Sequence, residues 1–389
     1  MSNEDDPAAE ARQDEDVLRP PATVTPELFA EWRAPRFGAA NPEELSNPWW
    51  NWLIETRLNA YQANKLLDGP SPFDAGPSWC FDRLGQSRTD LPDGTTVFIG
   101  GEHEDDYDPD FCIYNDVTIL GPDTPPRILG YPREVFPPTD FHSATLAGNR
   151  IIVIGALALE ENQRIGETQV FELDCEDWSM HRVASTGDCP GWIHKHQAAL
   201  TDDGRAIIVR DGMVERGPGR SCTENIDEWR LDLETMQWTR LTDRCWPRFS
   251  LQRKDGRPLG LLEARIAATA SEFLRHPESL PEAEREFLEM RINRCEKRYG
   301  RLPPLDRVSK LYRPSLAHKP LPDEEDDPGC HRIRIGNVTV RYLEDYLCVR
   351  LRVEGELDAE SVELLKTELR DHLEAIEGVE FIIESDATD

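Results

Sequence analysis

The segment FHSATLAGNRIIVIGA, residues 141–156, contains four features in a fixed order. A polar opening at residues 141–143 leads to a Gly148-Asn149 turn, then to the β-branched run 151–154, and small residues end the run at Gly155-Ala156. Gly-Asn pairs favour tight turns, and β-branched residues favour extended backbone. The order therefore predicts two antiparallel strands joined by a short turn.

The same order occurs once before and once after this segment. Gln86, His142 and His196 occupy the same place in the three openings, and the steps between them are 56 and 54 residues. Asp-Gly turns at 93–94 and 203–204 precede the apolar runs 97–99 and 207–209, and small or turn-forming residues follow at 100–101 and 211–212. A third strand is expected at 114–120, 169–173 and 228–233, and Trp178 and Trp238 mark a fourth. The pattern predicts three copies of a four-stranded unit within residues 77–246.

These landmarks resemble the kelch repeat: a polar opening strand, an apolar run ended by diglycine, Asn-Asp-Val at 115–117, and Leu-Asp followed by Trp. The resemblance implies β-propeller blades. Only the first copy keeps the full diglycine, and three blades are too few to close a ring, so a partial or open propeller is expected. An open array leaves a sheet edge that flanking helices, a partner or a second copy must cover, and association into a homo-oligomer is one way to do so.

The predicted fold is mainly β with α-helical segments around the repeats. Residues 1–24 are expected to be a disordered acidic tail, 25–70 N-terminal helices, 77–246 the repeats and 255–300 a helical hairpin. Residues 301–330 are expected to be a Pro-rich acidic linker, and 331–389 a small ββαβ-type α+β domain.

Two helical stripes give these helices their expected buried faces. Thr25-Pro26 and Asn47-Pro48 are helix starts, and the second helix is expected to run to about residue 67. Its apolar face comprises Trp50, Ile54, Leu58 and Tyr61. In the later hairpin the first helix is expected to bury Leu262, Ile266 and Phe273.

The composition excludes several classes of partner. The net charge is −31, from 75 acidic and 44 basic residues, so nucleic acid and anionic membrane surfaces are repelled. No apolar run is long enough to span a bilayer, and no secretory signal is visible. Nine cysteines without a C-x-x-C pair indicate reduced thiols, and we expect a cytoplasmic protein.

Binding residues are expected at two places. The acidic loop at residues 102–110 supplies Glu104, Asp105, Asp106 and Asp108, which would attract a basic protein. The third repeat opening supplies Trp192, His194 and His196. These features favour a non-enzymatic protein-interaction or scaffolding protein without a cofactor, because loops on a rigid scaffold commonly carry recognition.

The alternative is a metal-dependent enzyme with a site near the propeller axis. His194 and His196 alternate as residues on one face of a strand would, and His142 is the third weak candidate ligand. Glu104, Asp108 and Cys112 match the spacing of an iron site in some kelch proteins, but cysteine stands in place of histidine. A copper oxidase of galactose also has a kelch-like fold, but it is typically secreted. No P-loop, G-x-S-x-G, G-x-G-x-x-G or H-E-x-x-H motif is present.

Overall fold

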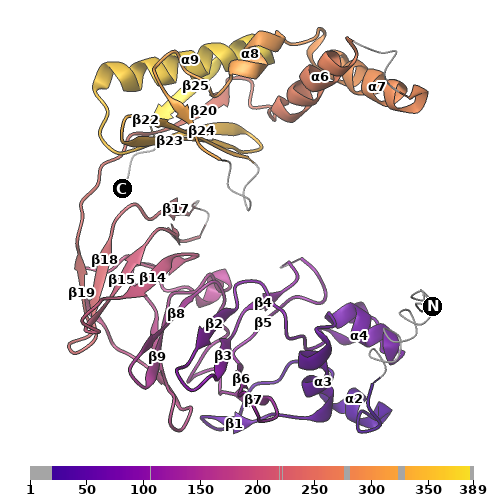
Figure 1. Ribbon diagram of the computed structural model, residues 1–389, viewed down its shortest axis with the longest axis vertical. Coiled ribbons are helices and arrows are strands. Elements are labelled where there is room, and N and C mark those ends of the chain that lie inside the picture. The colour runs from indigo at the N-terminus through magenta and orange to yellow at the C-terminus, as the bar shows by residue number, and fades with distance from the viewer. Residues whose placement is uncertain are drawn as a thin grey trace, which may run out of the picture. The chain divides into compact units, whose positions relative to one another are not determined.

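The computed structural model describes residues 20–105, 107–218, 220, 222–275, 281–322 and 329–385 (Figure 1). Most of the expected acidic tail, Asp106 and the acidic run 323–327 lie outside these residues. The chain divides into two compact units, Met1–Asp243 and Arg244–Asp389. Its described part is mixed α/β with several largely antiparallel sheets and no closed barrel. None of the described helices is long and apolar enough to cross a membrane.

The first unit begins with four short helices: α2 (Pro26–Trp32), α3 (Pro48–Thr56), α4 (Ala60–Leu66) and α5 (Pro72–Ala75). The Thr25 side chain accepts a hydrogen bond from the Leu28 amide, and the Asn47 side chain accepts one from the Trp50 amide, so both predicted starts are confirmed. The single helix predicted from residue 48 to 67 is wrong. Arg57 adopts a left-handed conformation that ends α3, and Asn59 caps α4.

Three largely antiparallel sheets follow. The first has the order β1-β7-β6-β3-β2, the second β11-β10-β9-β8 and the third β12-β19-β18-β15-β14. The first contains β1 (Glu43–Glu44), β2 (Ser87–Asp90), β3 (Thr96–Ile99), β6 (Val117–Leu120) and β7 (Arg127–Gly130). The second contains β8 (Ser143–Ala147), β9 (Arg150–Ile154), β10 (Val170–Asp174) and β11 (Met180–Arg182). The third contains β12 (Thr186–Gly187), β14 (Gln197–Leu200), β15 (Ala206–Arg210), β18 (Trp229–Asp232) and β19 (Gln237–Arg240), with β12 parallel to β19.

The three sheets begin in equivalent ways. Gly85, Phe141 and Lys195 precede the first strands and all have left-handed backbone, with φ of 61°, 46° and 53°. The Phe141 amide donates a 2.9 Å hydrogen bond to the Gly85 carbonyl, and the Lys195 amide donates a 2.8 Å bond to the Phe141 carbonyl. These bonds link the starts of β2, β8 and β14, whose strands neighbour one another in that order. The openings predicted from Gln86, His142 and His196 therefore occupy equivalent places.

The middle sheet is buried on both faces. Ile151 and Val153 pack in one core with Val97 and Ile99 of the first sheet. Ile152 and Ile154, which point to the opposite face of β9, pack in another core with residues of the third sheet. The unbroken apolar run of β9 thus reflects a strand between two layers, and each fully buried aliphatic side chain contributes about 1.5–3 kcal/mol.

The two outer sheets end the stack differently. The first is covered by the N-terminal helices in a core that contains Trp49, Trp50, Trp52 and Trp79. The third sheet alternates between buried and exposed residues, and its outward side carries charged and polar groups. The N-terminal helices therefore cover one outer face of the stack, and charged and polar side chains line the other.

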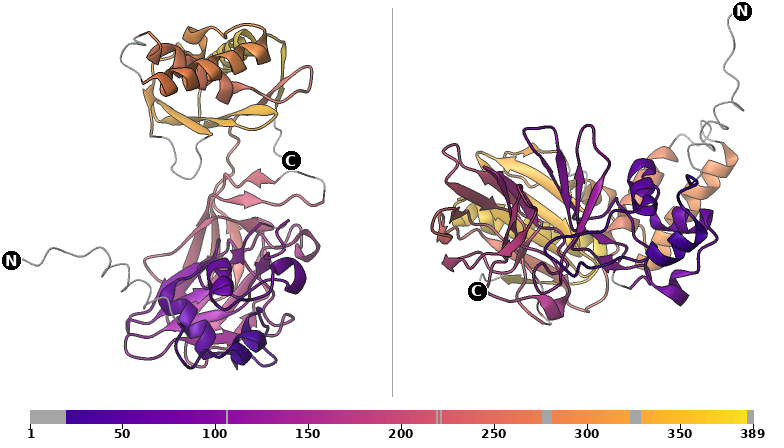
Figure 2. Two further views of the ribbon diagram at one scale, coloured as in Figure 1. Left: turned by 90° about the vertical axis from the view of Figure 1, so that its right-hand side faces the viewer. Right: turned by 90° about the horizontal axis from the view of Figure 1, so that it is seen from below.

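The second unit has a six-stranded sheet with the order β21-β22-β23-β24-β20-β25. Its strands are β20 (Arg248–Arg253), β21 (Lys319–Pro320), β22 (Cys330–Ile335), β23 (Val338–Glu344), β24 (Cys348–Glu354) and β25 (Phe381–Ser385). Its helices are α6 (Leu261–Phe273), α7 (Glu282–Tyr299), α8 (Leu305–Lys310) and α9 (Ala359–Glu377), which lie on one side of the sheet (Figure 2).

Two features of this unit differ from the expected boundaries. β20 lies between β24 and β25 and pairs antiparallel with both, so residues before the helices belong to the same sheet as the C-terminal strands. The stretch expected to be a linker contains α8 and β21, because Val308 and Leu311 are buried in the core of the unit.

The stripe predicted for α6 is wrong. The helix buries Leu261, Ala264, Ala267 and Ala270, whereas Leu262 and Phe273 are 64% and 57% exposed. Alanines three residues apart let a neighbouring helix approach closely, and α6 packs along α7. The larger apolar residues consequently lie on the outward side.

Candidate functional site

The long loops of the first unit gather at one end of the sheet stack. In each sheet the first strand runs away from the linked openings and the second returns, so the connection to the third strand lies beside the openings. These connections are residues 100–116, 155–169 and 211–228, and we call them the loop rim. The rim contains the pair β4 (Glu102–His103) and β5 (Cys112–Ile113), and β16 (Met213–Val214) with β17 (Thr223–Glu224). It also holds the 3-10 turn Glu160–Asn162.

The loop rim is strongly acidic. It contains fifteen Asp and Glu residues and three Arg residues, and no Lys. The β4–β5 hairpin carries the predicted group: Glu104 and Asp105 are exposed, and Asp108 is half-buried and accepts a 2.9 Å hydrogen bond from the Asp110 amide. Asp106 lies outside the described residues. The structure therefore presents at least two of these carboxylates to solvent on a short two-stranded hairpin.

A buried ion pair supports the base of this hairpin. Arg83 and Asp116 form a two-point contact, with Arg83 Nη2 2.9 Å from Asp116 Oδ2, and both side chains are almost fully buried. Trp79 Nε1 donates a 2.7 Å bond to the same carboxylate. Arg83 Nη1 also donates to the Gly100 carbonyl, 3.0 Å away, so the pair ties the segment before β2 to the start of the rim.

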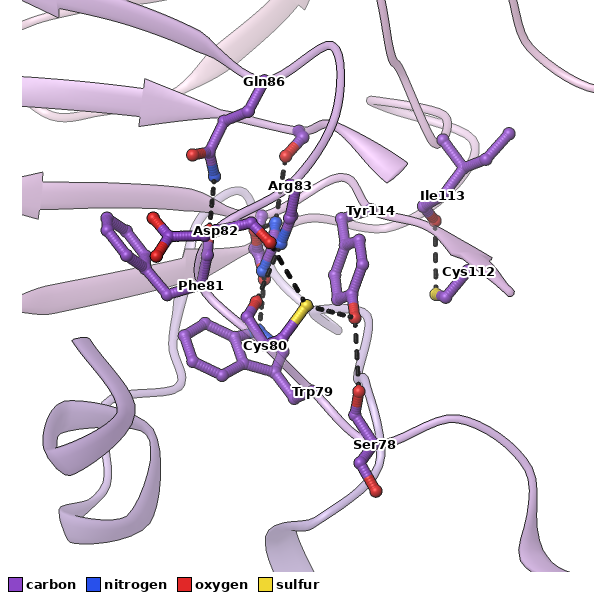
Figure 3. Close-up of polar contacts among 12 residues, drawn as sticks. Ser78, Trp79, Cys80, Phe81, Asp82, Arg83, Gln86, Cys112, Ile113 and Tyr114 are labelled. Atoms are coloured by element: carbon purple, nitrogen blue, oxygen red, sulfur yellow. Dashed lines mark hydrogen bonds and ion pairs between the residues drawn. The ribbon is translucent and has the colours of Figure 1, made fainter. Parts of the chain in front are cut away.

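The residues beside this pair have no activated nucleophile. Arg83 lies over the ring of Tyr114, 3.4 Å from its centroid, and Tyr114 Oη lies 3.7 Å from Cys80 Sγ (Figure 3). Burial raises the pKa of Cys80 to about 11 and that of Cys112 to about 12. Both thiols are therefore protonated at neutral pH.

Trp192, His194 and His196 are buried rather than displayed. Trp192 Nε1 donates a 3.1 Å bond to the Leu157 carbonyl, and His194 Nε2 lies 3.0 Å from Glu215 Oε1. The expectation that His194 and His196 share one strand face is wrong. His194 belongs to the short strand β13 (Ile193–His194), and the left-handed Lys195 separates it from β14.

His142 and His196 instead join neighbouring sheets. His142 Nε2 lies 2.8 Å from Ser87 Oγ, and His196 Nε2 lies 2.8 Å from Ser143 Oγ. Burial lowers the pKa of His142 to about 3 and that of His196 to about 4, so both rings are neutral at pH 7. Within the described residues, no three His, Cys, Asp or Glu side chains are arranged to hold a metal ion.

A pair of carboxyl groups, Glu102 and Asp140, lies at the rim and was not predicted from the sequence. Burial and the neighbouring charge of Asp140 raise the pKa of Glu102 to about 7, and burial raises the pKa of Asp140 as well. Asp140 Oδ1 accepts a 2.8 Å bond from the Ala158 amide, which ties this pair to the second rim loop. Repulsion between the two carboxylates favours the protonated form of Glu102. Only their positions, directly after the diglycine and directly before Phe141, gave any sign in the sequence.

Comparison with known proteins identifies no family. No protein-family model matches the chain, and no curated protein matches it. A solved structure titled "Structure of YjhT" is similar over 42% of this chain, with 13% sequence identity and a TM-score of 0.32. The chain spans 56% of the length of that structure.

Proposed function

We propose that the first unit is a non-enzymatic binding platform of kelch type and that its loop rim binds a basic protein. In this proposal, four strands of each of the three sheets form one blade of an open propeller. The repeated left-handed openings at Gly85, Phe141 and Lys195 and the repeated His–Ser contacts support it.

The negative charge of the loop rim is the reason for proposing a basic partner. The loop rim contains fifteen acidic and three basic residues, and it lies at one end of the sheet stack. Such a surface attracts positively charged proteins over several ångströms and repels nucleic acid. The buried Arg83–Asp116 pair holds the base of the β4–β5 hairpin, so its exposed carboxylates are displayed on a fixed support.

Affinity capture followed by a salt titration tests this proposal. The variant Glu104→Gln/Asp105→Asn/Asp108→Asn removes three charges, and its amide oxygens can still accept the local hydrogen bonds. The control Glu282→Gln/Glu284→Gln/Glu286→Gln removes three charges from exposed positions of α7 in the second unit.

The protein captured by the wild type should be basic, and its affinity should fall steeply with added salt. The hairpin variant should bind it at least about tenfold more weakly at low salt, because each lost rim charge slows association and weakens attraction. The control should bind as the wild type does. Equal binding by the hairpin variant, or binding insensitive to salt, would show that the rim charge does not select the partner.

A further inference from the structure

The second unit contains a cavity of about 900 Å³. It lies between α6, α8 and the strand pair β21–β22. Apolar side chains form part of its wall, among them Leu305, Val308, Leu311 and Ile333. A volume of this size suits a small organic molecule.

The charged residues of the cavity wall are mostly basic, whereas those of the chain as a whole are mostly acidic. Four arginines line it, against two carboxylates, Glu272 and Asp306, in a protein of net charge −31. Arginine presents a planar fork of donors that matches phosphate and carboxylate groups. The wall therefore concentrates the side chains that best recognise these anions.

One of the four arginines is already neutralised. Arg265 forms a two-point ion pair with Glu344, with Nη2 2.6 Å from Oε2, and Tyr312 Oη donates a 2.5 Å bond to the same carboxylate. Burial alone would raise the pKa of Glu344, but hydrogen bonds from His331, Arg265 and Tyr312 outweigh it and lower the pKa to about 2. Glu344 is thus ionised with its charge compensated, and it does not repel an anion in the cavity.

Arg275 and Arg313 differ from Arg265 in their contacts. Both are exposed, and neither side chain forms an ion pair or hydrogen bond within the part of the chain that the structure describes. Arg275 follows the C-terminal end of α6, and Arg313 follows that of α8. The helix dipole favours cations at these ends, but it does not explain why two uncompensated guanidinium groups line one cavity.

We propose that this cavity binds a small organic anion, whose phosphate or carboxylate group contacts Arg275 and Arg313 and whose apolar body lies against Leu305, Val308 and Leu311. This binding site is separate from the loop rim, and it does not depend on the function proposed for the first unit.

Calorimetric titration of the full-length protein at constant ionic strength tests the site. The probes are phenyl phosphate, phenylacetate and inorganic phosphate. Phenyl phosphate and phenylacetate share an aromatic body and differ in the anion, so they distinguish a phosphate site from a carboxylate site. Inorganic phosphate lacks the body and should bind more weakly than phenyl phosphate, because it leaves the apolar wall unfilled.

The variants Arg275→Gln and Arg313→Gln should each weaken binding of the preferred probe about tenfold, the usual effect of losing one charge-assisted hydrogen bond. Arg257→Gln, which removes an exposed arginine of the same unit outside the cavity, should bind as the wild type does. The proposal is overturned if neither aromatic anion binds. It is also overturned if the cavity variants change the melting temperature but not the affinity for the probes. The arginines would then only stabilise the C-terminal ends of the helices.

Discussion

The backbone amide of Lys195 donates a 2.8 Å hydrogen bond to the carbonyl of Phe141, a residue 54 positions earlier, and both residues have left-handed backbone. Left-handed backbone is uncommon outside glycine and costs energy for lysine and phenylalanine. Its recurrence at matching points indicates that the stacked sheets impose it. The sheets are therefore packed closely at these junctions.

Substitution of Gly155 should be much more damaging than substitution of Gly148. Both have positive φ, 73° and 69°, but a Cβ on Gly155 would lie 2.2 Å from the Ile193 carbonyl oxygen, whereas nothing lies within 4 Å of one on Gly148. We expect Gly148→Ala to lower the free energy of unfolding by about 1 kcal/mol, from backbone strain alone, and Gly155→Ala by about 3 kcal/mol or more. Urea unfolding measures both. Equal losses would mean that the sheets are not closely joined there.

Removing one partner of the Arg83–Asp116 pair should strongly destabilise the first unit. Asp116→Asn leaves the buried Arg83 charge uncompensated, and such a loss typically costs about 3–5 kcal/mol. Asp82→Asn is the matched control, because Asp82 pairs with Arg57 at 2.6 Å with both side chains about half exposed. That change should cost less than about 1 kcal/mol. Chemical denaturation of the three proteins provides the comparison, and similar losses for the two variants would contradict it.

Acid should destabilise the first unit through its buried histidines. The pKa values of His142 and His196 in the folded protein lie below their unfolded value of about 6.5. Below pH 6.5 the unfolded chain therefore binds more protons than the folded protein does. Each histidine therefore removes about 1.4 kcal/mol of stability per pH unit between about pH 6 and 4. Glu102 acts in the opposite direction, since its folded pKa of about 7 makes the folded state bind more protons between about pH 4.5 and 7.

Comparing variants separates these contributions. His196→Gln should reduce the slope of the unfolding free energy against pH by about 1.4 kcal/mol per pH unit between pH 6 and 5. His181→Gln, which removes an exposed histidine of β11, is the control for the loss of a histidine side chain. An unaltered slope in His196→Gln would show that His196 does not stay neutral in the folded protein.

The polar outer face of the third sheet should keep the stack from associating with a second copy. Arg210, which lies 3.1 Å from Glu228, and Arg230, which pairs with Asp232, flank Ile208 on this face. Light scattering should give the monomer mass of 44.4 kDa. Arg210→Val/Arg230→Val creates a continuous apolar strip and should cause concentration-dependent association, whereas Arg257→Val in the second unit should not. A wild-type dimer would contradict this expectation.

The predicted helix caps, turn and buried strand formed because their signals act within a few residues, whereas the buried face predicted for α6 depends on its neighbours and was wrong. The caps at Thr25 and Asn47, the turn at Gly148 and the apolar run of β9 each formed as their residue types predict. In the candidate site, the exposed acidic loop that carries Glu104 and Asp105 could be recognised from its charge alone, but its β4–β5 pairing could not.

Sequence by itself thus determined the repeated order of strands and the acidity of the loops between them, because both are properties of short segments. Tertiary structure decided the rest: that Lys195 separates His194 from His196, that Glu102 meets Asp140, and that β20 enters the sheet of the second unit. These outcomes join residues far apart in the chain. Their free energies depend on burial and on partners that no local pattern contains, so they arise only when the sheets and helices pack together.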